Sequence, residues 1–433
     1  MTSSIQHTQL ANGIDVLTDQ APHFEAVAIS VSFRVGAIHE PEDKAGISHL
    51  LEHMMFRGSV NRSGDEIQNA IAELGGEINA CTDEDSTSYT AQVVKDDLAV
   101  ALDILSDMVL HPRLDETDLS LEKQIIEREN CRGCYNCSMR EGFYDLSYPD
   151  SPLQNPIIGH PETLESITCD DLVEYHAGRY VGANLIITVA GDVAHEDVVR
   201  AAETAFGALK QGKAAGYPRF DFTADQMHIG HSGDTATLRL GFDFSHLDRK
   251  ERRAARTYLD ILGGHGQSLL MQELREKRGL VYGVAAWDYS VSGNEIALVD
   301  VNGEVKKIRE VVDVMAQTMQ DAACNLSPDL AERNLRRLRN DMRMYRDDLS
   351  ARVEQVLDCM AYKGHVLDRA ALEKSYLEIT AGDIMAAGQA LLASDPTILT
   401  SGSTRHAPKF DVVRKLLKGT AGLDAAVIAA QQV

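Results

Sequence analysis

The sequence has no apolar run long enough to span a membrane, and its start lacks the basic segment followed by an apolar segment that marks a secretory signal. Positive charge is scarce as well: 42 Lys and Arg stand against 66 Asp and Glu, a formal charge of -24. Such a surface repels the phosphates of nucleic acids and is compatible with cationic peptides as partners. Acidic surfaces that serve only solubility are the alternative. We therefore expect a cytoplasmic protein that binds neither nucleic acid nor membrane.

The seven cysteines are odd in number and have no secretory context, so a disulfide framework is not expected. Three of them cluster in the run Cys131-Arg-Gly-Cys-Tyr-Asn-Cys137. The spacing of Cys131, Cys134 and Cys137 could ligate a soft metal or begin an iron-sulfur ligand set, although a fourth cysteine is missing at the expected distance. Free thiols or a local disulfide are the alternatives.

A chain of 433 residues exceeds what one hydrophobic core usually serves, so two or more domains are expected. Residues 210–218 are rich in Lys, Gly, Ala and Pro, which is typical of a linker, and they divide residues 1–212 from 218–433. After the linker, a strand pattern over 236–244, a helix pattern over 252–262 and a glycine-rich break repeat the order of the first half. The expected fold is α+β, with two duplicated halves that each form a mostly antiparallel sheet covered by helices.

The segment His49-Leu-Leu-Glu-His53 places two imidazoles and a carboxylate on one face of a helix. His49 and His53 are one turn apart, and Glu52 lies three residues after His49. Neutral imidazole is a good zinc ligand, and a carboxylate that does not bind the metal can take a proton from metal-held water. The order His-x-x-Glu-His is the inverzincin signature. A structural histidine pair on an amphipathic helix is the alternative.

A catalytic zinc site needs a third protein ligand, and the helix expected to end near residue 129 offers two candidates. Glu122 and Glu129 are seven residues apart and nearly in register, with Ile125 and Ile126 on the same stripe. A carboxylate on an apolar stripe is costly to bury unless a cation compensates it. The alternative is that both glutamates lie at a solvated helix edge.

With these motifs the chain resembles the pitrilysin-type inverzincin zinc metallopeptidases, and among them the bacterial group similar to the mitochondrial processing peptidase. The resemblance extends over nearly the whole chain. It rests on His-Leu-Leu-Glu-His-Met-Met-Phe-Arg-Gly-Ser at 49–59, Gly75-Gly76 before Asn79-Ala80-x-Thr82, Glu122-Lys-Gln-Ile-Ile-x-x-Glu129, Asn-Pro-Ile-Ile-Gly at 155–159, and Leu-Arg-Glu-Lys-Arg-Gly-Leu-Val-Tyr at 274–282.

The resemblance implies one zinc ion per chain, bound by His49, His53 and Glu129. It implies that Glu52 is the general base that activates the zinc-held water. Glu122 would be the family's second carboxylate on its helix, which orients the ligands without binding the metal itself. The cysteine cluster directly after Glu129 departs from the family, whose members usually carry acidic and polar residues there.

The resemblance also implies a peptide-binding surface. Asn79 and Ala80 would lie on an edge strand to which an extended peptide adds as a further strand. Arg275 and Tyr282, from the second half, would hold the peptide and stabilise the oxyanion. From the residues alone, Asn79 would be a turn residue, Arg275 part of a surface salt bridge and Tyr282 a half-buried strand residue.

The predicted function is that of a zinc-dependent endopeptidase, which cleaves extended peptides or short unfolded polypeptides inside a closed chamber. One chain supplies one pair of halves, whereas the family's chamber is built from four halves. We therefore expect a dimer, either of two copies or with a homologous subunit. The alternative is a non-catalytic or partner-dependent peptide-binding subunit of a heterodimeric peptidase. Such relatives usually lose part of the ligand set, and this chain keeps every member.

Overall fold

The computed structural model describes residues 5–129 and 135–419, without the side chains of residues 135–138. The chain divides into two compact units. Unit 1 comprises Met1–Cys134, Asp150–Arg219 and Asp341–Ala371. Unit 2 comprises Tyr135–Pro149, Phe220–Asn340 and Leu372–Val433. The division therefore differs from a single cut at 212–218, because each half of the sequence contributes one segment to the unit formed mainly by the other half.

Unit 1 contains a six-stranded sheet in the order β1-β2-β6-β3-β5-β4. The strands β2 and β6 are parallel, and all other neighbours are antiparallel. β4 is the last strand at one edge of this sheet. The strand bounds are β1 (Ile5–Gln9), β2 (Asp15–Gln20), β3 (Ala26–Phe33), β4 (Glu77–Thr82), β5 (Thr87–Val94) and β6 (Leu185–Gly191).

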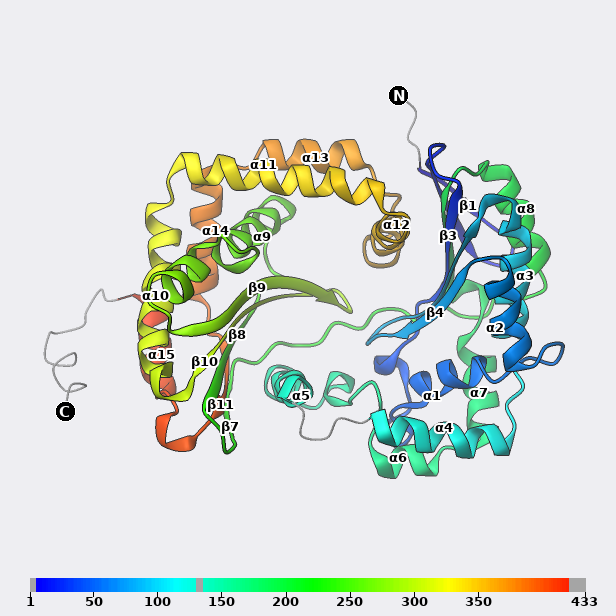
Figure 1. Ribbon diagram of the computed structural model, residues 1–433, viewed down its shortest axis with the longest axis horizontal. Coiled ribbons are helices and arrows are strands. Elements are labelled where there is room, and N and C mark those ends of the chain that lie inside the picture. The colour runs from blue at the N-terminus through cyan, green and yellow to red at the C-terminus, as the bar shows by residue number, and fades with distance from the viewer. Residues whose placement is uncertain (1–4, 130–134, 420–433) are drawn as a thin grey trace, which may run out of the picture. The chain divides into compact units, whose positions relative to one another are not determined.

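The two faces of the unit 1 sheet are covered by different helices (Figure 1). On one side, Val27, Ile29 and Val31 of β3 belong to the main core, together with residues of α1 and α3. The helices on this side are α1 (Ile47–Met55), α2 (Gly64–Glu73), α3 (Leu98–Leu110), α4 (Glu116–Glu129), α6 (Pro161–Ser166), α7 (Cys169–Arg179) and α8 (His195–Phe206).

The opposite face of this sheet is covered by α12 (Leu349–Lys363), which comes from the second half of the sequence. Leu349 and Val353 of α12 pack against Ala28 and Ala190, whose small side chains leave room for the helix. Asp19 of β2 is fully buried and forms ion pairs with Arg352 and Arg369, which belong to the same segment of the chain as α12, Asp341–Ala371. Helix α12, which unit 1 receives from the second half of the sequence and which we call an exchanged helix, is therefore held by both apolar packing and a buried ion-pair cluster.

Unit 2 contains a five-stranded sheet in the order β7-β11-β8-β10-β9, with β7 and β11 parallel and the other pairs antiparallel. The strand bounds are β7 (Gln226–Gly230), β8 (Thr235–Asp243), β9 (Val281–Val291), β10 (Asn294–Glu304) and β11 (Thr397–Gly402). Besides α12, the second half of the sequence forms the helices α9 (Arg249–Gly263), α10 (Ile308–Asn325), α11 (Pro328–Met344), α13 (Arg369–Leu377), α14 (Ala381–Ala393) and α15 (Phe410–Lys418).

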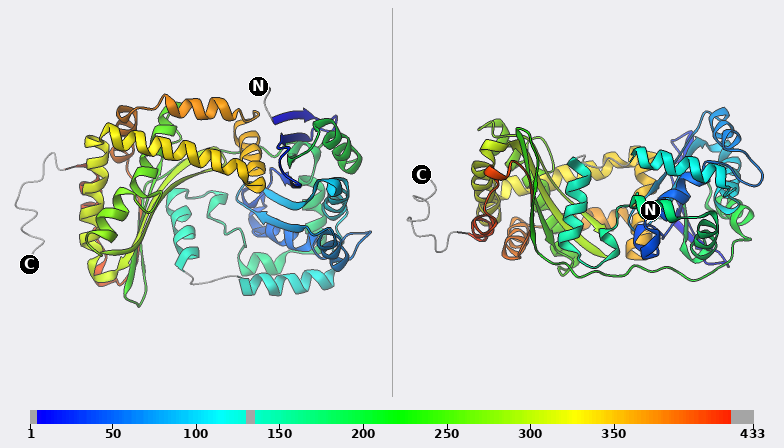
Figure 2. Two further views of the ribbon diagram at one scale, coloured as in Figure 1. Left: turned by 45° about the horizontal axis from the view of Figure 1, so that its top comes forward. Right: turned by 90° about the horizontal axis from the view of Figure 1, so that it is seen from below.

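Unit 2 also receives a helix from the other half of the sequence, because α5 (Tyr135–Ser147) packs on β11 and β7 (Figure 2). Gly241 of β8 allows this close approach, since an added Cβ would lie 2.1 Å from the ring of Phe143. The helices α5 and α12 occupy corresponding places in the element orders of the two halves of the sequence. The exchange is therefore reciprocal.

The strand order β7-β11-β8-β10-β9 corresponds to β2-β6-β3-β5-β4, with the parallel pair at the same place in each sheet. The predicted fold class is thus confirmed: two duplicated α+β halves, each with a mostly antiparallel sheet covered by helices. Within residues 5–129 and 135–419, none of the helices combines the length and the apolar character that a membrane crossing requires.

Candidate metal centre

Helix α1 carries the His-x-x-Glu-His motif and begins at a tightly built corner. Gly46 precedes the helix with φ +95°, and an added Cβ there would lie 2.8 Å from the backbone of Gly159. The carboxylate of Glu40 accepts hydrogen bonds from the backbone N–H groups of Gly46 and Ser48, at 2.7 and 2.8 Å. Glu40 therefore satisfies N–H groups at the helix start that have no partner within the helix.

The apolar residues of α1 decide which way the motif faces. Five apolar side chains of the helix are buried in the core of unit 1, namely Ile47, Leu50, Leu51, Met54 and Met55. His49, Glu52 and His53 lie outside this stripe and are half-buried. The amphipathic pattern thus holds the helix against the sheet and leaves the three motif side chains facing away from the core.

Helix α4 packs beside α1 and brings the predicted third ligand to the two histidines. Leu119 and Ile126 anchor α4 in the core. One ligand atom each of His49, His53 and Glu129 lie within 4.8 Å of one another. His53 Nε2 is 3.6 Å from Glu129 Oε2. The structure therefore brings together the three side chains that were predicted as ligands.

The other predicted carboxylate of α4, Glu122, is buried and contacts His53 from the opposite side of the ring. Its Oε2 lies 2.8 Å from His53 Nδ1, and its Oε1 accepts a hydrogen bond from Nε of Arg57. With Nδ1 donating its hydrogen to Glu122, the lone pair of His53 Nε2 faces Glu129. Burial tends to raise the pKa of Glu122, but the hydrogen bonds from His53 and Arg57 lower it below its ordinary value.

The two imidazoles differ in their surroundings. Burial, together with the neighbouring His53, lowers the pKa of His49 to about 4. His49 is therefore neutral at physiological pH, which is the form that binds a metal. Its Nδ1 is buried and has no hydrogen-bond partner among the described residues. Burial also disfavours the charged form of His53, but hydrogen bonding to Glu122 and the nearby carboxylates raise its pKa overall.

Glu52 is held by a residue for which the sequence suggested no role. The hydroxyl of Thr82, at the end of β4, donates a hydrogen bond of 2.5 Å to Glu52 Oε2. Burial is the largest cause of a raised pKa for Glu52, and the negative charge of Glu129 adds to it; Thr82 and His53 act in the opposite direction. A carboxylate with a raised pKa is suited to accept and return a proton.

An open cavity of about 590 Å³ lies beside Glu52 and His53. The start of α2 forms one wall, and Arg113 and Asp118 line another part. Arg57 and Glu122 also contribute to the lining. The cavity therefore opens next to the carboxylate of Glu52.

The predicted peptide-binding residues of unit 1 lie on the edge strand. Asn79 is exposed and Ala80 is half-buried, and both belong to β4, which pairs with β5. Asn79 Oδ1 accepts a hydrogen bond of 3.0 Å from the backbone N–H of Ala80. Asn79 is therefore a strand residue and not the turn residue that its type alone suggested.

The remaining predicted residues belong to unit 2 or lie outside the described part of the chain. Arg275 is in a short π-helix (Met271–Glu276), and Tyr282 follows in β9. The Arg275 side chain is 53% exposed, and Tyr282 is 56% exposed. Cys131 and Cys134 lie outside the described residues, as does the side chain of Cys137.

Models of a known protein family match both halves of the chain. Residues 15–159 match the family described as insulinase (peptidase family M16), and residues 166–338 match the peptidase M16 inactive domain. The chain belongs to peptidase family M16. The M16 match to the first half includes His49, Glu52, His53 and Glu129, so the candidate metal centre lies in the part of the chain that corresponds to the insulinase domain.

Relatives of this M16 chain carry names that refer to zinc. An uncharacterized zinc protease of Rickettsia felis is 28% identical over 400 residues, which is 92% of this chain and 97% of the relative. The uncharacterized zinc protease YmxG of Bacillus subtilis is 29% identical over 313 residues, 71% of this chain and 76% of the relative. The predicted resemblance is thereby confirmed at the level of the family.

Two solved structures share the M16 fold. A protease from Helicobacter pylori superposes with a TM-score of 0.82 at 19% identity, covering 92% of this chain and 99% of its own. A peptidase M16 inactive domain protein from Pseudomonas fluorescens has a TM-score of 0.83 at 20% identity, covering 92% and 98%. At these identities the likeness establishes the fold.

Proposed function

We propose that this M16 chain is a zinc-dependent endopeptidase that cleaves extended peptides or short unfolded polypeptides within a closed chamber. The observation that carries the proposal is the convergence of His49, His53 and Glu129 within 4.8 Å, with Glu52 on the same face of α1. Two imidazoles and one carboxylate are a donor set found in catalytic zinc sites. The names of the relatives support the same metal.

His49, His53 and Glu129 would hold one zinc ion per chain. A bound zinc ion supplies Lewis acidity, which polarises a carbonyl and makes water more acidic. The surroundings of the three side chains fit this role. His49 is kept neutral by burial, its Nδ1 has no partner among the described residues, and Glu122 fixes the orientation of His53.

Glu52 is the proposed general base. Its carboxylate takes a proton from the attacking water and returns it to the nitrogen of the leaving amine. The hydrogen bond from Thr82 holds one carboxylate oxygen, so the other is available for the water. Glu52 does not need to bind the metal for this chemistry, and the ligand cluster is complete without it.

The peptide is proposed to add to the free edge of β4, with Asn79 and Ala80 along its path. Backbone hydrogen bonding to an edge strand gives affinity that tolerates different sequences, whereas pockets such as the cavity beside Glu52 give selectivity. Arg275 and Tyr282 can both donate hydrogen bonds to an oxyanion, and both side chains are exposed in unit 2. We propose that they act on the peptide from that unit.

The closed chamber requires a second pair of halves, so we propose a dimer of this chain with itself or with a homologous subunit. The duplication supports this, because the two units of one chain account for only two of the four halves that the resemblance implies. Sedimentation of the purified chain at micromolar concentration checks the homodimer. A monomer that cleaves peptides unaided would contradict the four-half chamber.

Mass spectrometry of a peptide library tests the proposed activity. The full chain is incubated with the library alone, with a chelator, and with a chelator followed by added zinc. Cleavage should stop with the chelator and return with zinc, and Glu52→Gln should abolish cleavage while zinc stays bound. Peptide binding without cleavage by the zinc-loaded chain would instead favour a non-catalytic subunit of a heterodimeric peptidase.

A further inference from the structure

Arg57 lies four residues after His53, just beyond the end of the motif helix, and is joined to His53 through a buried carboxylate. Nε of Arg57 donates a hydrogen bond to Oε1 of Glu122, while Oε2 of the same carboxylate lies 2.8 Å from His53 Nδ1. The Glu122 side chain is only 5% exposed, and that of Arg57 is 30% exposed. The contacts therefore form a line that runs from Arg57 through Glu122 to His53.

We propose that Arg57 is a positioning residue for the metal centre, which fixes the Glu122 carboxylate and through it the orientation of His53. This inference rests on the proposed function, because it gives His53 the task of binding zinc. It adds a residue that neither the five-residue motif His-x-x-Glu-His nor the ligand cluster includes.

The physical reason lies in the two oxygens of Glu122. A carboxylate attached to a flexible side chain can rotate, and a buried carboxylate without a cationic partner is costly. The hydrogen bond from Arg57 holds one oxygen and offsets the charge, so the second oxygen remains directed at His53 Nδ1. The His53 ring is thereby held with Nε2 facing Glu129, 3.6 Å away.

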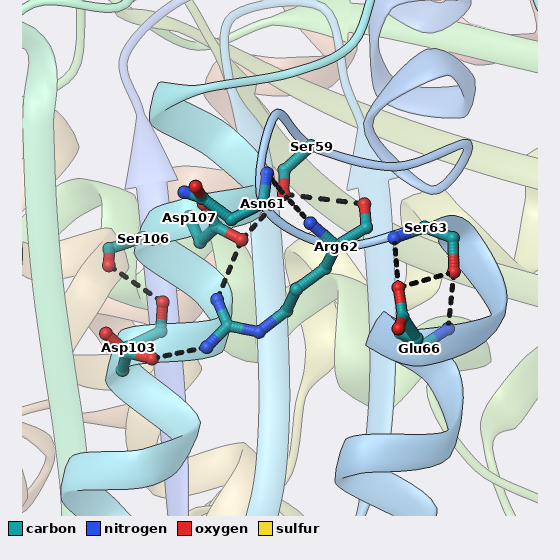
Figure 3. A network of polar contacts seen from close by, with 8 residues as sticks. All are labelled: Ser59, Asn61, Arg62, Ser63, Glu66, Asp103, Ser106 and Asp107. Atoms are coloured by element: carbon teal, nitrogen blue, oxygen red, sulfur yellow. Dashed lines mark hydrogen bonds and ion pairs between the residues drawn. The ribbon is translucent and has the colours of Figure 1, made fainter.

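A second arginine, Arg62, lies in the same loop between α1 and α2 and provides a matched comparison (Figure 3). Arg62 donates a hydrogen bond of 2.7 Å to Asp107, whose side chain is 6% exposed, and the Arg62 side chain is itself 30% exposed. Ser59 and Asn61 also donate to Asp107, at 2.6 Å each. Arg62 thus satisfies a buried carboxylate as Arg57 does, but the Asp107 carboxylate is held by Ser59, Asn61 and Arg62, none of which is a proposed zinc ligand. The network of Figure 3 holds the turn between α1 and α2.

The pair Arg57→Met and Arg62→Met therefore separates an effect on the metal from a loss of packing. Zinc affinity of the full-length chain is measured by competition with a chromophoric chelator, and the visible spectrum is recorded after cobalt substitution. Thermal unfolding of the metal-free variants reports stability. Arg57→Lys is included because it retains a positive donor near Glu122.

We expect Arg57→Met to weaken zinc binding about tenfold, the lower end of the range for residues that orient metal ligands, and to change the cobalt spectrum. Arg57→Lys should recover most of the affinity. Arg62→Met should lower the melting temperature and leave zinc affinity and spectrum unchanged. Together these results would establish Arg57 as a positioning residue.

Equal zinc affinity in Arg57→Met and the parent chain would overturn the inference, even if KM rose, because Arg57 would then be a substrate contact of the cavity. Equal weakening by Arg57→Met and Arg62→Met would overturn it too, because general destabilisation would explain both. Failure of the parent chain itself to bind zinc would refute the proposed function, and the inference with it. Zinc binding by the parent chain thus distinguishes the two failures.

Discussion

His53 and Glu122 lie in contact through a 2.8 Å hydrogen bond between Nδ1 and Oε2, although 69 residues separate them in the sequence. This contact determines which nitrogen of His53 is available to a metal, because Nδ1 carries the hydrogen and Nε2 faces Glu129. The geometry of the candidate site therefore depends on α4 twice, through a carboxylate that would bind zinc and one that orients a ligand.

Glu122→Gln tests this orienting contact. The amide keeps the shape but loses the charge that attracts the Nδ1 hydrogen, so we expect zinc affinity to fall about 10- to 100-fold. Chelator competition measures the change. Glu127→Gln, on the exposed face of the same helix, is the control and should bind zinc like the parent chain. Unchanged affinity in Glu122→Gln would show that the contact does not support the metal.

The hydroxyl of Thr82 provides a test of how Glu52 is held. Valine has the shape of threonine without the hydroxyl, and a hydrogen bond to a charged group contributes about 1.5–3 kcal/mol, so Thr82→Val should lower kcat roughly 10- to 100-fold. Zinc content should not change. Thr82→Ser keeps the hydroxyl and should stay close to the parent chain. Equal kcat for the valine and serine variants would show that the hydroxyl of Thr82 does not support Glu52 in the reaction.

Asp19 connects the exchanged segment to the sheet of unit 1. Its Oδ2 lies 2.8 Å from Nε of Arg352 and 2.7 Å from Nη2 of Arg369. Asp19→Ala leaves two largely buried guanidinium groups without this partner, which should cost about 3–5 kcal/mol of unfolding free energy. Denaturant titration measures the loss, and hydrogen exchange should show weaker protection of α12.

The exposed pair of Asp197 and Arg200 provides the control for this prediction. Asp197→Ala should cost no more than about 1 kcal/mol, because solvent screens the charges. If Asp19→Ala were as mild as Asp197→Ala, the buried cluster would not hold the exchanged helix.

The buried carboxyl group of Glu40 should make the stability of the protein depend on pH. Burial raises its pKa to about 7, although the N–H groups of Ser48 and Gly46 lower it. A carboxyl group with a raised pKa binds its proton more tightly in the folded protein. Its contribution to the unfolding free energy is therefore complete below its ordinary pKa of 4.5 and is lost as the pH rises through about 7.

Glu40→Gln removes this titration and keeps a hydrogen-bond acceptor for the start of α1. The unfolding free energy of the parent chain minus that of Glu40→Gln should fall as the pH rises from 4.5 through about 7, by about 3 kcal/mol in all, and level off once the pH is well above 7. Denaturant titrations of both metal-free proteins at several pH values give this difference. Parallel curves across the window would mean that Glu40 does not titrate there.

The fold class could be predicted from the sequence, whereas the exchange of helices could not. The strand over 236–244 and the helix over 252–262 correspond to β8 and α9, and their order reveals the duplication. An apolar face such as that of Leu349 and Val353 shows that a helix needs a partner. It does not show which sheet the partner belongs to, because Ala28 and Ala190 are far away in the sequence.

The candidate site, too, could be predicted from the sequence only in part. The spacing of His49 and His53 and the resemblance around Glu129 were enough to predict three side chains that the structure brings together. The parts played by Arg57 and Thr82 could not be predicted, because they depend on side-chain contacts with Glu122 and Glu52 across 65 and 30 residues. The sequence motifs contained both residues but did not show their partners.

The most direct test of the account is anomalous diffraction at the zinc edge from crystals of the full chain loaded with zinc. We predict one strong peak per chain, about 2.0–2.2 Å from a nitrogen of His49, a nitrogen of His53 and an oxygen of Glu129. Glu52 and Glu122 should lie outside bonding distance. A peak elsewhere, or the lack of one between α1 and α4, would contradict the metal centre and the peptidase proposal that depends on it.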